Sequence, residues 1–290
     1  MGSNHQPRRA PEKAIADMTR PPSKPWQNRS KRDRPRQQGQ DPTSPVLQDD
    51  DSRVFLYGVH AVAAALANPE RRIRKLMATE NAENRLSEAI AERKLPIDRV
   101  RPKDLDRLLG PDTVHQGILA EAEPLPEPAL DDLIRAAGSG GGPLMVLDQV
   151  TDPHNVGAVL RSAAVFGAAG LITTRRHSPP LNGTLAKSAS GALELVPLAL
   201  VQNLARTLDE LKSAGVTVIG LDGDGETLLD DAPLTGAVAF VLGAEGKGLR
   251  QLTRETCDKV CRIGTAGALA SLNVSNAAAI ALHLAAMRRR

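Results

Sequence analysis

Aromatic residues are scarce in this sequence, and Phe, Trp and Tyr together make up 2% of its 290 residues. A protein that reads RNA by stacking bases on aromatic rings needs several exposed rings, so the composition argues against that mode of binding. Cysteine is equally rare: Cys257 and Cys261 have no Cys or His nearby in the sequence to complete a metal site. We expect two buried free thiols of a cytosolic protein, with no zinc site and no disulfide.

Long apolar runs are also missing. No continuous apolar segment reaches the length of about 18 residues that a membrane span requires, and the N-terminus lacks the apolar core of a signal peptide. We therefore expect a cytoplasmic protein. An excess of one charge is missing as well, since 37 Lys and Arg residues face 34 Asp and Glu residues and the pI is about 9.0. This mild basicity permits an RNA partner without requiring one.

Residues 1–52 are rich in Pro, Arg, Lys, Gln and Asp and show no apolar periodicity. This composition predicts a disordered basic tail. Basic residues are densest from Arg29 to Arg36 (RSKRDRPR), where a flexible arm would add nonspecific affinity for phosphates. A solvated tail without a dedicated role is the alternative.

Between residues 53 and 124 the sequence alternates between strand and helix patterns. A short strand turns at Gly58 into an alanine-rich helix that ends near Asn68. A strand over 71–79, a helix over 82–94, a strand over 97–100 and a helix over 104–109 are expected next, and the segment from His115 (HQGILAEAEPL) forms the last strand. This alternation predicts a small α/β domain.

Two histidines and a basic run in this domain are candidate functional residues. His60 and His115 have no nucleophile or acid partner nearby in the sequence, so we expect structural or RNA-contacting roles for them. The basic run either grips phosphates or forms the solvated edge of a sheet. It consists of Arg71, Arg72, Arg74 and Lys75.

A domain boundary is expected near Pro124, where PLPEP breaks regular structure. A short helix over 129–137 and the glycine-rich stretch GSGGGP follow. Strands over 170–174, 195–200 and 216–221 then alternate with helices over 181–191 and 203–214. This rhythm predicts a second α/β domain with a parallel sheet, which extends over residues 125–290.

The junction from Leu144 to Arg161 is the first place where chemistry is expected. The apolar run Leu144 to Leu147 predicts a strand that is buried on both faces. Asp152 then caps a helix, and Asn155 and Arg161 fall on its first turns, beyond the carboxyl end of the strand. Open α/β sheets bind ligands in this position. The alternative is that Asn155 is a second cap and Arg161 a surface charge.

A second strand, within Ala237 to Leu249 (AVAFVLGAEGKGL), leads into a glycine-rich turn that presents Glu245. The spacing of Gly243, Gly246 and Gly248 is that of neither a dinucleotide fingerprint nor a P-loop. Close approach of the backbone to a flat ligand best explains the glycines. An ordinary turn with an exposed acid is the alternative.

A third segment combines a strand through Ile263, a loop of small residues and a helix that starts near Asn273. Ser271 and Asn273 are either helix-capping residues or polar groups of a site. The last helix is rich in alanine, so its surface is shallow and suits close packing, against a second subunit or within one.

These three segments contain DPHNVGAVLRSA, LGAEGKGL and SLNVSNAAAI, in that order. They resemble the signature motifs of the SpoU/TrmH group of SPOUT RNA ribose 2'-O-methyltransferases. YGVHAV and HQGI in the first domain resemble the small L30e-like RNA-binding domain that precedes the catalytic domain in many members. The resemblance covers the chain from about Arg53 onward. It implies a homodimer and a deep trefoil knot in the C-terminal domain, a topology that no spacing argument predicts.

The resemblance also implies the chemistry. S-Adenosylmethionine lies bent in the knot, held by backbone groups at Gly243, Ile263 and Leu272, and its methyl group goes to a ribose 2'-hydroxyl; no metal is expected. An arginine guanidinium stays protonated in proteins, so Arg161 is expected to hold the adjacent phosphate and stabilise the developing alkoxide. The residues expected to orient it, the ribose and the cofactor are Asn155, Glu245, Ser271 and Asn273. One departure concerns cofactor binding, because Ile-Gly-Thr stands at 263–265 where the family commonly has Ile-Pro-Met.

Within the family, the chain looks most like the subgroup that acts on a guanosine of large-subunit (23S) ribosomal RNA. This resemblance rests on the extra N-terminal domain and on the motifs VTDPHNVGAVLRSA and HQGI. A tRNA ribose 2'-O-methyltransferase is the alternative within the family. A non-catalytic RNA-binding ribosome-assembly factor would not need to keep the polar residues of all three motifs. A nicotinamide-dependent oxidoreductase would bind NAD, which the glycine spacing argues against.

Overall fold

The computed structural model of the protein describes residues 47, 49, 52–267 and 272–289. The tail expected over residues 1–52 lies almost entirely outside these residues, and so does Ser271. Residues 43–290 form one compact unit. The described residues form two sheets, one with strand order β1-β4-β2-β3 and one with strand order β7-β6-β5-β10-β8-β11-β9.

The four-stranded sheet is mixed. Strand β4 pairs antiparallel with both β1 and β2, and β3 pairs parallel with β2. In chain order the elements of this part are β1 (Val54–Tyr57), α1 (Val59–Ala67), β2 (Ile73–Ala78), α2 (Glu80–Arg85), α3 (Ser87–Arg93), β3 (Ile97–Arg99), α4 (Pro102–Leu109) and β4 (Ile118–Ala122).

The helix expected over 82–94 is two helices. It begins earlier than expected because the Thr79 hydroxyl accepts a hydrogen bond from the Ala82 N–H at 3.4 Å and caps α2. It breaks at Leu86, whose backbone (φ −118°, ψ 15°) leaves the helical region. The break places Ala82 and Ile90 in the same hydrophobic core.

The basic run of the first domain is paired with acids. Arg72 and Arg74 lie near Glu123, and Lys75 contacts Asp98 at 3.0 Å. These basic side chains are largely exposed, but they do not lie at a sheet edge, because β2 lies between β4 and β3. Arg71 differs, because its side chain is 3% exposed and its guanidinium contacts Glu194, in the part of the chain that forms the seven-stranded sheet, at 2.7 Å.

The seven-stranded sheet is parallel at every strand pair. Its carboxyl ends therefore meet along one edge, in the order β6, β5, β10, β8, β11. In chain order the elements of this part are α5 (Leu130–Gly138), β5 (Leu144–Asp148), α6 (Pro153–Phe166), β6 (Gly170–Thr174), α7 (Gly183–Ser188), the 3-10 turn Ala192–Glu194, β7 (Leu198–Val201), α8 (Leu204–Ser213), β8 (Thr217–Leu221), β9 (Thr227–Leu228), the 3-10 turn Leu229–Asp231, β10 (Val238–Gly243), α9 (Gln251–Thr256), β11 (Lys259–Arg262) and α10 (Val274–Arg288).

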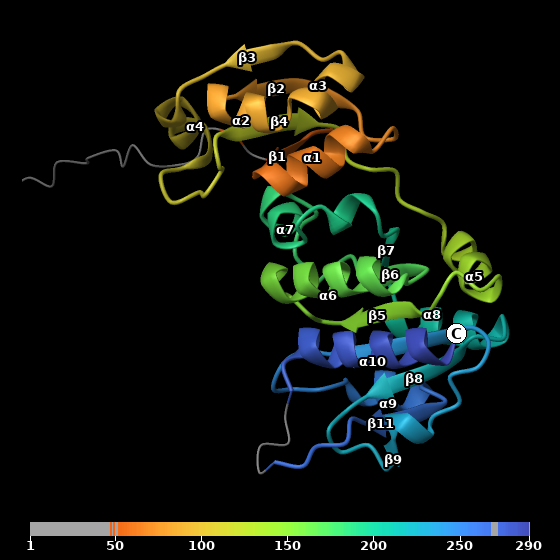
Figure 1. The fold of residues 1–290 in the computed structure, drawn as a ribbon. Coiled ribbons are helices and arrows are strands. Elements are labelled where there is room, and N and C mark those ends of the chain that lie inside the picture. The colour runs from red at the N-terminus through yellow and green to blue at the C-terminus, as the bar shows by residue number, and fades with distance from the viewer. Residues whose placement is uncertain (1–46, 48, 50–51, 268–271, 290) are drawn as a thin grey trace, which may run out of the picture. The chain divides into compact units, whose positions relative to one another are not determined.

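Helices cover both faces of this sheet. On one face, Met145 and Leu147 of β5 share a core with residues of α6 and α10, which lie side by side (Figure 1). On the other face, Leu144 and Val146 pack with residues of α5 and α8. Because both faces are buried, β5 is apolar at successive positions, which confirms the parallel α/β architecture expected from the sequence.

Three elements differ from expectation. The helix expected over 181–191 is the shorter α7 followed by a 3-10 turn, and the strand expected over 195–200 begins only at Leu198. Strand β9 was not expected; it pairs with β11 at the end of the sheet. Helix α7 is held close to β1, since a Cβ added at Gly183 would lie 2.2 Å from the carbonyl oxygen of Phe55.

Candidate functional site

Three polar side chains from distant segments meet at the carboxyl edge of the seven-stranded sheet. The Asn273 amide nitrogen donates to Asn155 Oδ1 at 3.0 Å and to Glu245 Oε2 at 3.2 Å. The Asn155 amide nitrogen donates to the same Glu245 oxygen at 3.3 Å. These residues, which we call the polar cluster, are three of the five polar residues that the sequence motifs predicted.

Local sequence fixes each of these positions. Asp152 accepts a hydrogen bond from the His154 N–H at 2.9 Å and caps α6, with Pro153 in the first helical position. Asn273 caps α10, because its side-chain oxygen accepts from the Ser275 N–H at 2.9 Å. Asn273 therefore has both roles that the sequence left open, since its oxygen caps the helix while its nitrogen joins the polar cluster.

The glycine turn after β10 presents Glu245. Gly246 and Gly248 have φ values of 77° and 66°, which favour glycine. A Cβ added at Gly243 would lie 2.0 Å from the carbonyl oxygen of Gly248, so the turn folds back on its own backbone. The three glycines are thus required by the turn itself, a reason that the sequence interpretation, close approach to a ligand, did not include.

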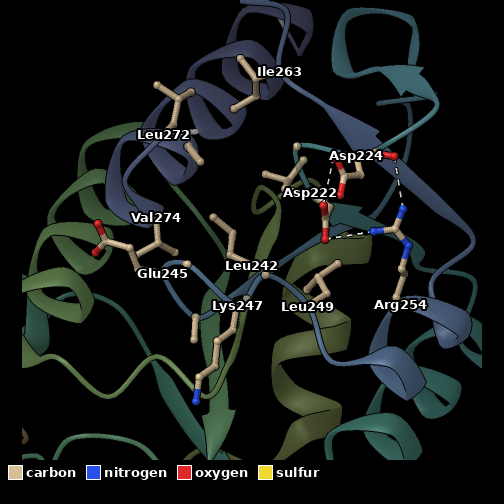
Figure 2. Close-up of a pocket in the computed structure, with 17 residues that line it drawn as sticks. Asp222, Asp224, Leu242, Glu245, Lys247, Leu249, Arg254, Ile263, Leu272 and Val274 are labelled. Carbon is tan, nitrogen blue, oxygen red and sulfur yellow. Dashed lines mark hydrogen bonds and ion pairs between the residues drawn. The ribbon is translucent and has the colours of Figure 1, made fainter. Parts of the chain in front are cut away.

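A cavity of about 540 Å³ lies behind this turn (Figure 2). Its volume falls within the range of about 300–1,000 Å³ that is usual for small-ligand pockets. Gly243, Ile263 and Leu272 all line it, so the structure brings together the three residues that the sequence motifs assigned to the cofactor. The larger apolar side chains on its walls belong to Leu221, Leu242, Leu249, Ile263, Leu272 and Val274.

The departure at 263–265 leaves the cavity wall intact. Ile263 is partly buried and lines the cavity. Among the described residues, a Cβ added at Gly264 would meet the Leu228 side chain alone, at 3.6 Å, which is an ordinary van der Waals contact. These residues therefore do not sterically require glycine at this position.

Arg161 is separate from the polar cluster. It lies on α6 with its side chain exposed, and it makes no hydrogen bond or ion pair with another described residue. It is six positions after Asn155, which turns its side chain about 120° away around the helix axis. His154 and Val165 lie on the same outward face of α6 as Arg161. The structure thus joins Asn155, Glu245 and Asn273 but leaves Arg161 apart.

Four charged residues of the cavity were not predicted from the sequence. Asp222 and Asp224 follow β8, Lys247 belongs to the glycine turn, and Arg254 belongs to α9. Arg254 Nη1 lies 3.0 Å from Asp222 Oδ2. The sequence carried a signal for the two acids, because LDGDGE directly follows an apolar strand and so lies at the same carboxyl edge as the other site segments.

A buried carboxylate supports the glycine turn from β5. The Asp148 side chain is fully buried, and its Oδ1 lies 2.6 Å from the Arg250 Nε. Its second oxygen accepts from the Arg250 N–H at 3.2 Å. Since Asp148 pairs with Gly243 in the sheet, this contact ties the end of β5 to the start of α9 across the turn.

Both cysteines are free thiols near this region. Burial raises the pKa of the Cys257 thiol from 9.0 to about 12, and the nearby Asp258 carboxylate adds to the effect. Burial also raises the pKa of the fully buried Cys261 thiol. Neither thiol is therefore a nucleophile near neutral pH.

The motifs YGVHAV and HQGI meet in space. The Gln116 side-chain oxygen accepts a hydrogen bond from the Val59 N–H at 2.9 Å, at the start of α1. His115 is buried and accepts from the Gly117 N–H at 3.0 Å, while its Nε2 lies 3.0 Å from Asp106. These contacts give His115 a structural role, whereas His60 is exposed.

In the part of the chain that the structure describes, no helix combines the length and apolarity needed to cross a bilayer.

Residues 143–283 match the SpoU rRNA methylase family, and residues 55–128 match the family described as RNA 2'-O ribose methyltransferase substrate binding.

Known proteins resemble the chain over most of its length. A Vibrio vulnificus protein named 23S rRNA (guanosine-2'-O-)-methyltransferase RlmB is 42% identical over 246 residues, covering 82% of this chain and 98% of the relative. A Ralstonia nicotianae protein of the same name is 44% identical over 244 residues, covering 81% and 96%. The crystal structure of the SpoU methyltransferase AviRb from Streptomyces viridochromogenes, in complex with AdoMet, covers 82% of this chain and 91% of its own, with 26% identity and a TM-score of 0.69. The chain belongs to the SpoU rRNA methylase family.

Proposed function

We propose that this protein transfers a methyl group from S-adenosylmethionine to the ribose 2'-hydroxyl of a guanosine in 23S ribosomal RNA. The observation that carries the proposal is the polar cluster of Asn155, Glu245 and Asn273, formed at the rim of the cavity that Gly243, Ile263 and Leu272 line. The relatives named as 23S rRNA guanosine 2'-O-methyltransferases support this substrate.

The cavity suits the cofactor. Its apolar walls, which include Leu242 and Ile263, offer a place for the flat adenine ring, and its acids suit a cationic ligand. Backbone groups at Gly243, Ile263 and Leu272 would hold the adenosine and methionine parts. S-Adenosylmethionine supplies an electrophilic methyl group on a sulfonium. The protein's own residues must then aim the nucleophile at it.

The nucleophile is the difficult partner, because a ribose hydroxyl is weakly nucleophilic near neutral pH. We assign to Arg161 the task of holding the adjacent phosphate and stabilising the alkoxide as it develops. Asn155, Glu245 and Asn273 orient the ribose and the cofactor. Ser271, which lies outside the described residues, is assigned to the same polar group.

We propose that the protein is a homodimer, and that Arg161 acts beside the dimer interface. Ile280 and Met287 are 41% and 42% exposed and lie two turns apart on one face of α10. Val165, on the adjoining helix α6, is 76% exposed and follows Arg161 by one turn. An apolar stripe of this kind suits a second subunit.

The alanines of α10 have another role. Ala278, Ala281 and Ala285 are buried within the protomer, so the shallow surface that the sequence suggested for a partner is used internally. Light scattering at micromolar concentration is expected to give the mass of a dimer. A monomer mass would contradict the proposed homodimer and the proposed position of Arg161 beside a dimer interface.

The finer architecture belongs to the same proposal. We propose a trefoil knot in the domain over 125–290, an L30e-like domain over 53–124 and a disordered tail over 1–52. The knot is supported by strand order, since β10 lies between β5 and β8 while α10 returns to pack on α6. A ribosomal RNA substrate implies that the protein acts in the cytoplasm.

An exposed arginine in the loop after β6 supports an RNA partner. Arg176 and His177 follow β6, the strand next to β5, and both are exposed. The Thr173 hydroxyl lies 2.7 Å from the Ser178 hydroxyl, which holds this loop against the sheet. The side chain of Arg176 has no ion-pair partner among the described residues, so it is available to a phosphate.

The proposal is tested by mapping ribose methylation in ribosomal and transfer RNA from cells with and without the gene. Loss of one 2'-O-methylguanosine in 23S RNA, restored by the purified protein and S-adenosylmethionine, is the expected result. Loss at a tRNA position would replace the substrate with tRNA. Unchanged methylation of both, with altered ribosome assembly, would make the protein a non-catalytic factor.

A further inference from the structure

Asp222 is the least exposed of the acids that line the cavity. It directly follows β8, and its side chain is 15% exposed although it carries a charge. In the sheet Leu221 pairs with Leu242, so Asp222 lies beside Gly243, one of the residues assigned to the cofactor. Figure 2 shows Asp222 and Arg254 on one side of the cavity and Glu245 on the other.

The main chain and the side chain of Asp222 are both fixed. Its N–H donates to the Cys261 carbonyl at 3.0 Å, and its carbonyl accepts from the Gly225 N–H at 3.0 Å. Oδ1 accepts from the Asp224 N–H at 3.0 Å, and Oδ2 lies 3.0 Å from Arg254 Nη1. A carboxylate held in this way is already oriented before a ligand binds, which lowers the entropic cost of binding.

The glycine turn leaves room for this carboxylate. A Cβ added at Gly248 would lie 3.0 Å from Asp222 Oδ2, a tight contact that would require the carboxylate to shift by a few tenths of an ångström. Gly248 therefore permits the acid to face the cavity as well as supplying a positive φ to the turn. The glycine at position 248 of the turn and the Asp222 carboxylate therefore fit together sterically.

Three donor groups of S-adenosylmethionine are candidates for the carboxylate: the ribose diol, the α-ammonium group and the adenine 6-amino group, which offers one nitrogen where the diol offers two adjacent hydroxyls. A carboxylate can accept about four hydrogen bonds, and two of the sites on Asp222 are already used. Its charge is balanced by Arg254, so an ammonium gains less from it than from a lone acid. The remaining sites suit two neutral hydroxyl donors.

We propose that Asp222 binds the ribose hydroxyls of the adenosine part of S-adenosylmethionine, with Arg254 as the residue that positions it. The assignment rests on the proposed function, since it takes the same cofactor. It also agrees with the position of the polar cluster: Glu245 and Asp222 lie on opposite sides of the cavity (Figure 2), so a methyl group held beside Glu245 would leave the adenosine on the side of Asp222.

Calorimetry on the full chain tests the assignment with two probes. S-Adenosylhomocysteine has the adenosine and the amino-acid part, whereas 5'-methylthioadenosine has the adenosine alone. Asp222→Ala is expected to weaken both by the same factor, about tenfold, as for the loss of a hydrogen bond to a charged group. Asp222→Asn, which keeps one acceptor oxygen, is expected to weaken both by a smaller common factor.

Glu226→Gln is the matched control. Glu226 is an exposed acid of the same loop, its side chain makes no hydrogen bond or ion pair with another described residue, and it does not line the cavity. Its removal is expected to leave both affinities within twofold of wild type. Melting temperatures of all variants show whether the fold is retained, and Asp222→Asn carries the test if Asp222→Ala does not fold.

Three results would overturn the assignment. Unchanged affinity in folded Asp222 variants would mean that the carboxylate does not contact the cofactor. Weakening of S-adenosylhomocysteine alone would assign Asp222 to the amino-acid part instead. Wild-type protein that binds neither probe would overturn the proposed cofactor itself, a failure that is separate from the first two because it appears without any substitution.

Discussion

The Asn273 amide nitrogen donates to Asn155 Oδ1 at 3.0 Å, although the two residues are 118 positions apart in the chain. The same nitrogen donates to Glu245, while the Asn273 oxygen caps α10. The two ends of one side chain therefore have separate roles. A substitution that changes only the nitrogen separates the site from the stability of the helix.

The substitution Asn273→Asp removes the donor nitrogen and keeps the capping oxygen. The cap is retained because an acid caps a helix as well as an amide does. The donor is lost, and a second carboxylate is placed against Glu245, which disfavours the cluster. We expect the single-turnover rate of RNA methylation to fall about 100-fold, as for the loss of one preorganised donor, with the melting temperature nearly unchanged.

Asn273→Ala is the comparison. It removes the cap as well, at a cost of about 1 kcal/mol in the free energy of unfolding. Both variants are expected to lose activity, but only Asn273→Ala is expected to lose stability. Full activity in Asn273→Asp would show that the polar cluster is a capping network and not part of the reaction.

Arg161→Ala is expected to abolish most methyl transfer while leaving S-adenosylhomocysteine affinity within twofold. The reason is that the guanidinium is assigned to the phosphate and the alkoxide, away from the cavity, and one such donor contributes about 100-fold or more to the rate. Arg161→Lys is expected to recover little, because an ammonium lacks the planar two-point geometry. Arg135→Ala, at an exposed arginine of α5, is the control. Substantial turnover in Arg161→Ala would remove Arg161 from the mechanism.

Much of the site was predictable because its segments share one physical property. Each motif follows an apolar strand, and parallel strands bring their carboxyl ends to one edge, so Asn155 and Glu245 had to lie near each other. The cap at Asn273 was readable from residue type alone. The same rule applied to the loop after β8 would have identified Asp222, but the loop had no resemblance to draw attention to it.

Other features were not readable from local sequence. No glycine or proline marks the break at Leu86, so the end of α2 depends on packing within the first domain. The requirement for glycine at Gly243 comes from the backbone of Gly248, five residues later, and appears only when the turn is closed. The outward position of Arg161 follows from helix geometry, but its meaning depends on a second subunit.

Gly243→Ala is expected to abolish binding of S-adenosylhomocysteine and to lower the melting temperature. A Cβ at this position would lie 2.0 Å from a backbone oxygen, which cannot move without opening the turn. Gly138→Ala is the control, because a Cβ there meets no atom within 4 Å. It is expected to be neutral or slightly stabilising. Wild-type binding in Gly243→Ala would mean that the turn is not needed to form the cavity.

Glu194→Ala is expected to lower the free energy of unfolding by about 3–5 kcal/mol, because it leaves Arg71 as an unpaired buried charge. Both side chains are nearly inaccessible, at 3% and 2% exposure. The exposed pair Arg206 and Glu210 is the comparison, and Glu210→Ala is expected to cost about 0.3–0.5 kcal/mol. Urea unfolding measures both, and equal costs would show that the buried pair contributes no more than a surface pair.

The buried thiol of Cys257 is expected to make the free energy of unfolding depend on pH at alkaline pH. Burial raises the pKa of its thiol from 9.0 to about 12, and Sγ donates to the Thr253 carbonyl at 3.2 Å. The unfolded chain therefore releases this proton near pH 9 while the folded protein keeps it, so the contribution is complete below pH 9 and is lost as pH rises toward 12. Urea unfolding from pH 8 to 10.5 is expected to show a steeper loss of stability in wild type than in Cys257→Ala. Alkylation of Cys257 at pH 8 is likewise expected to be much slower in the folded protein than in urea, since only the thiolate reacts. Equal dependence of the unfolding free energy on pH in wild type and in Cys257→Ala would contradict the burial of this thiol.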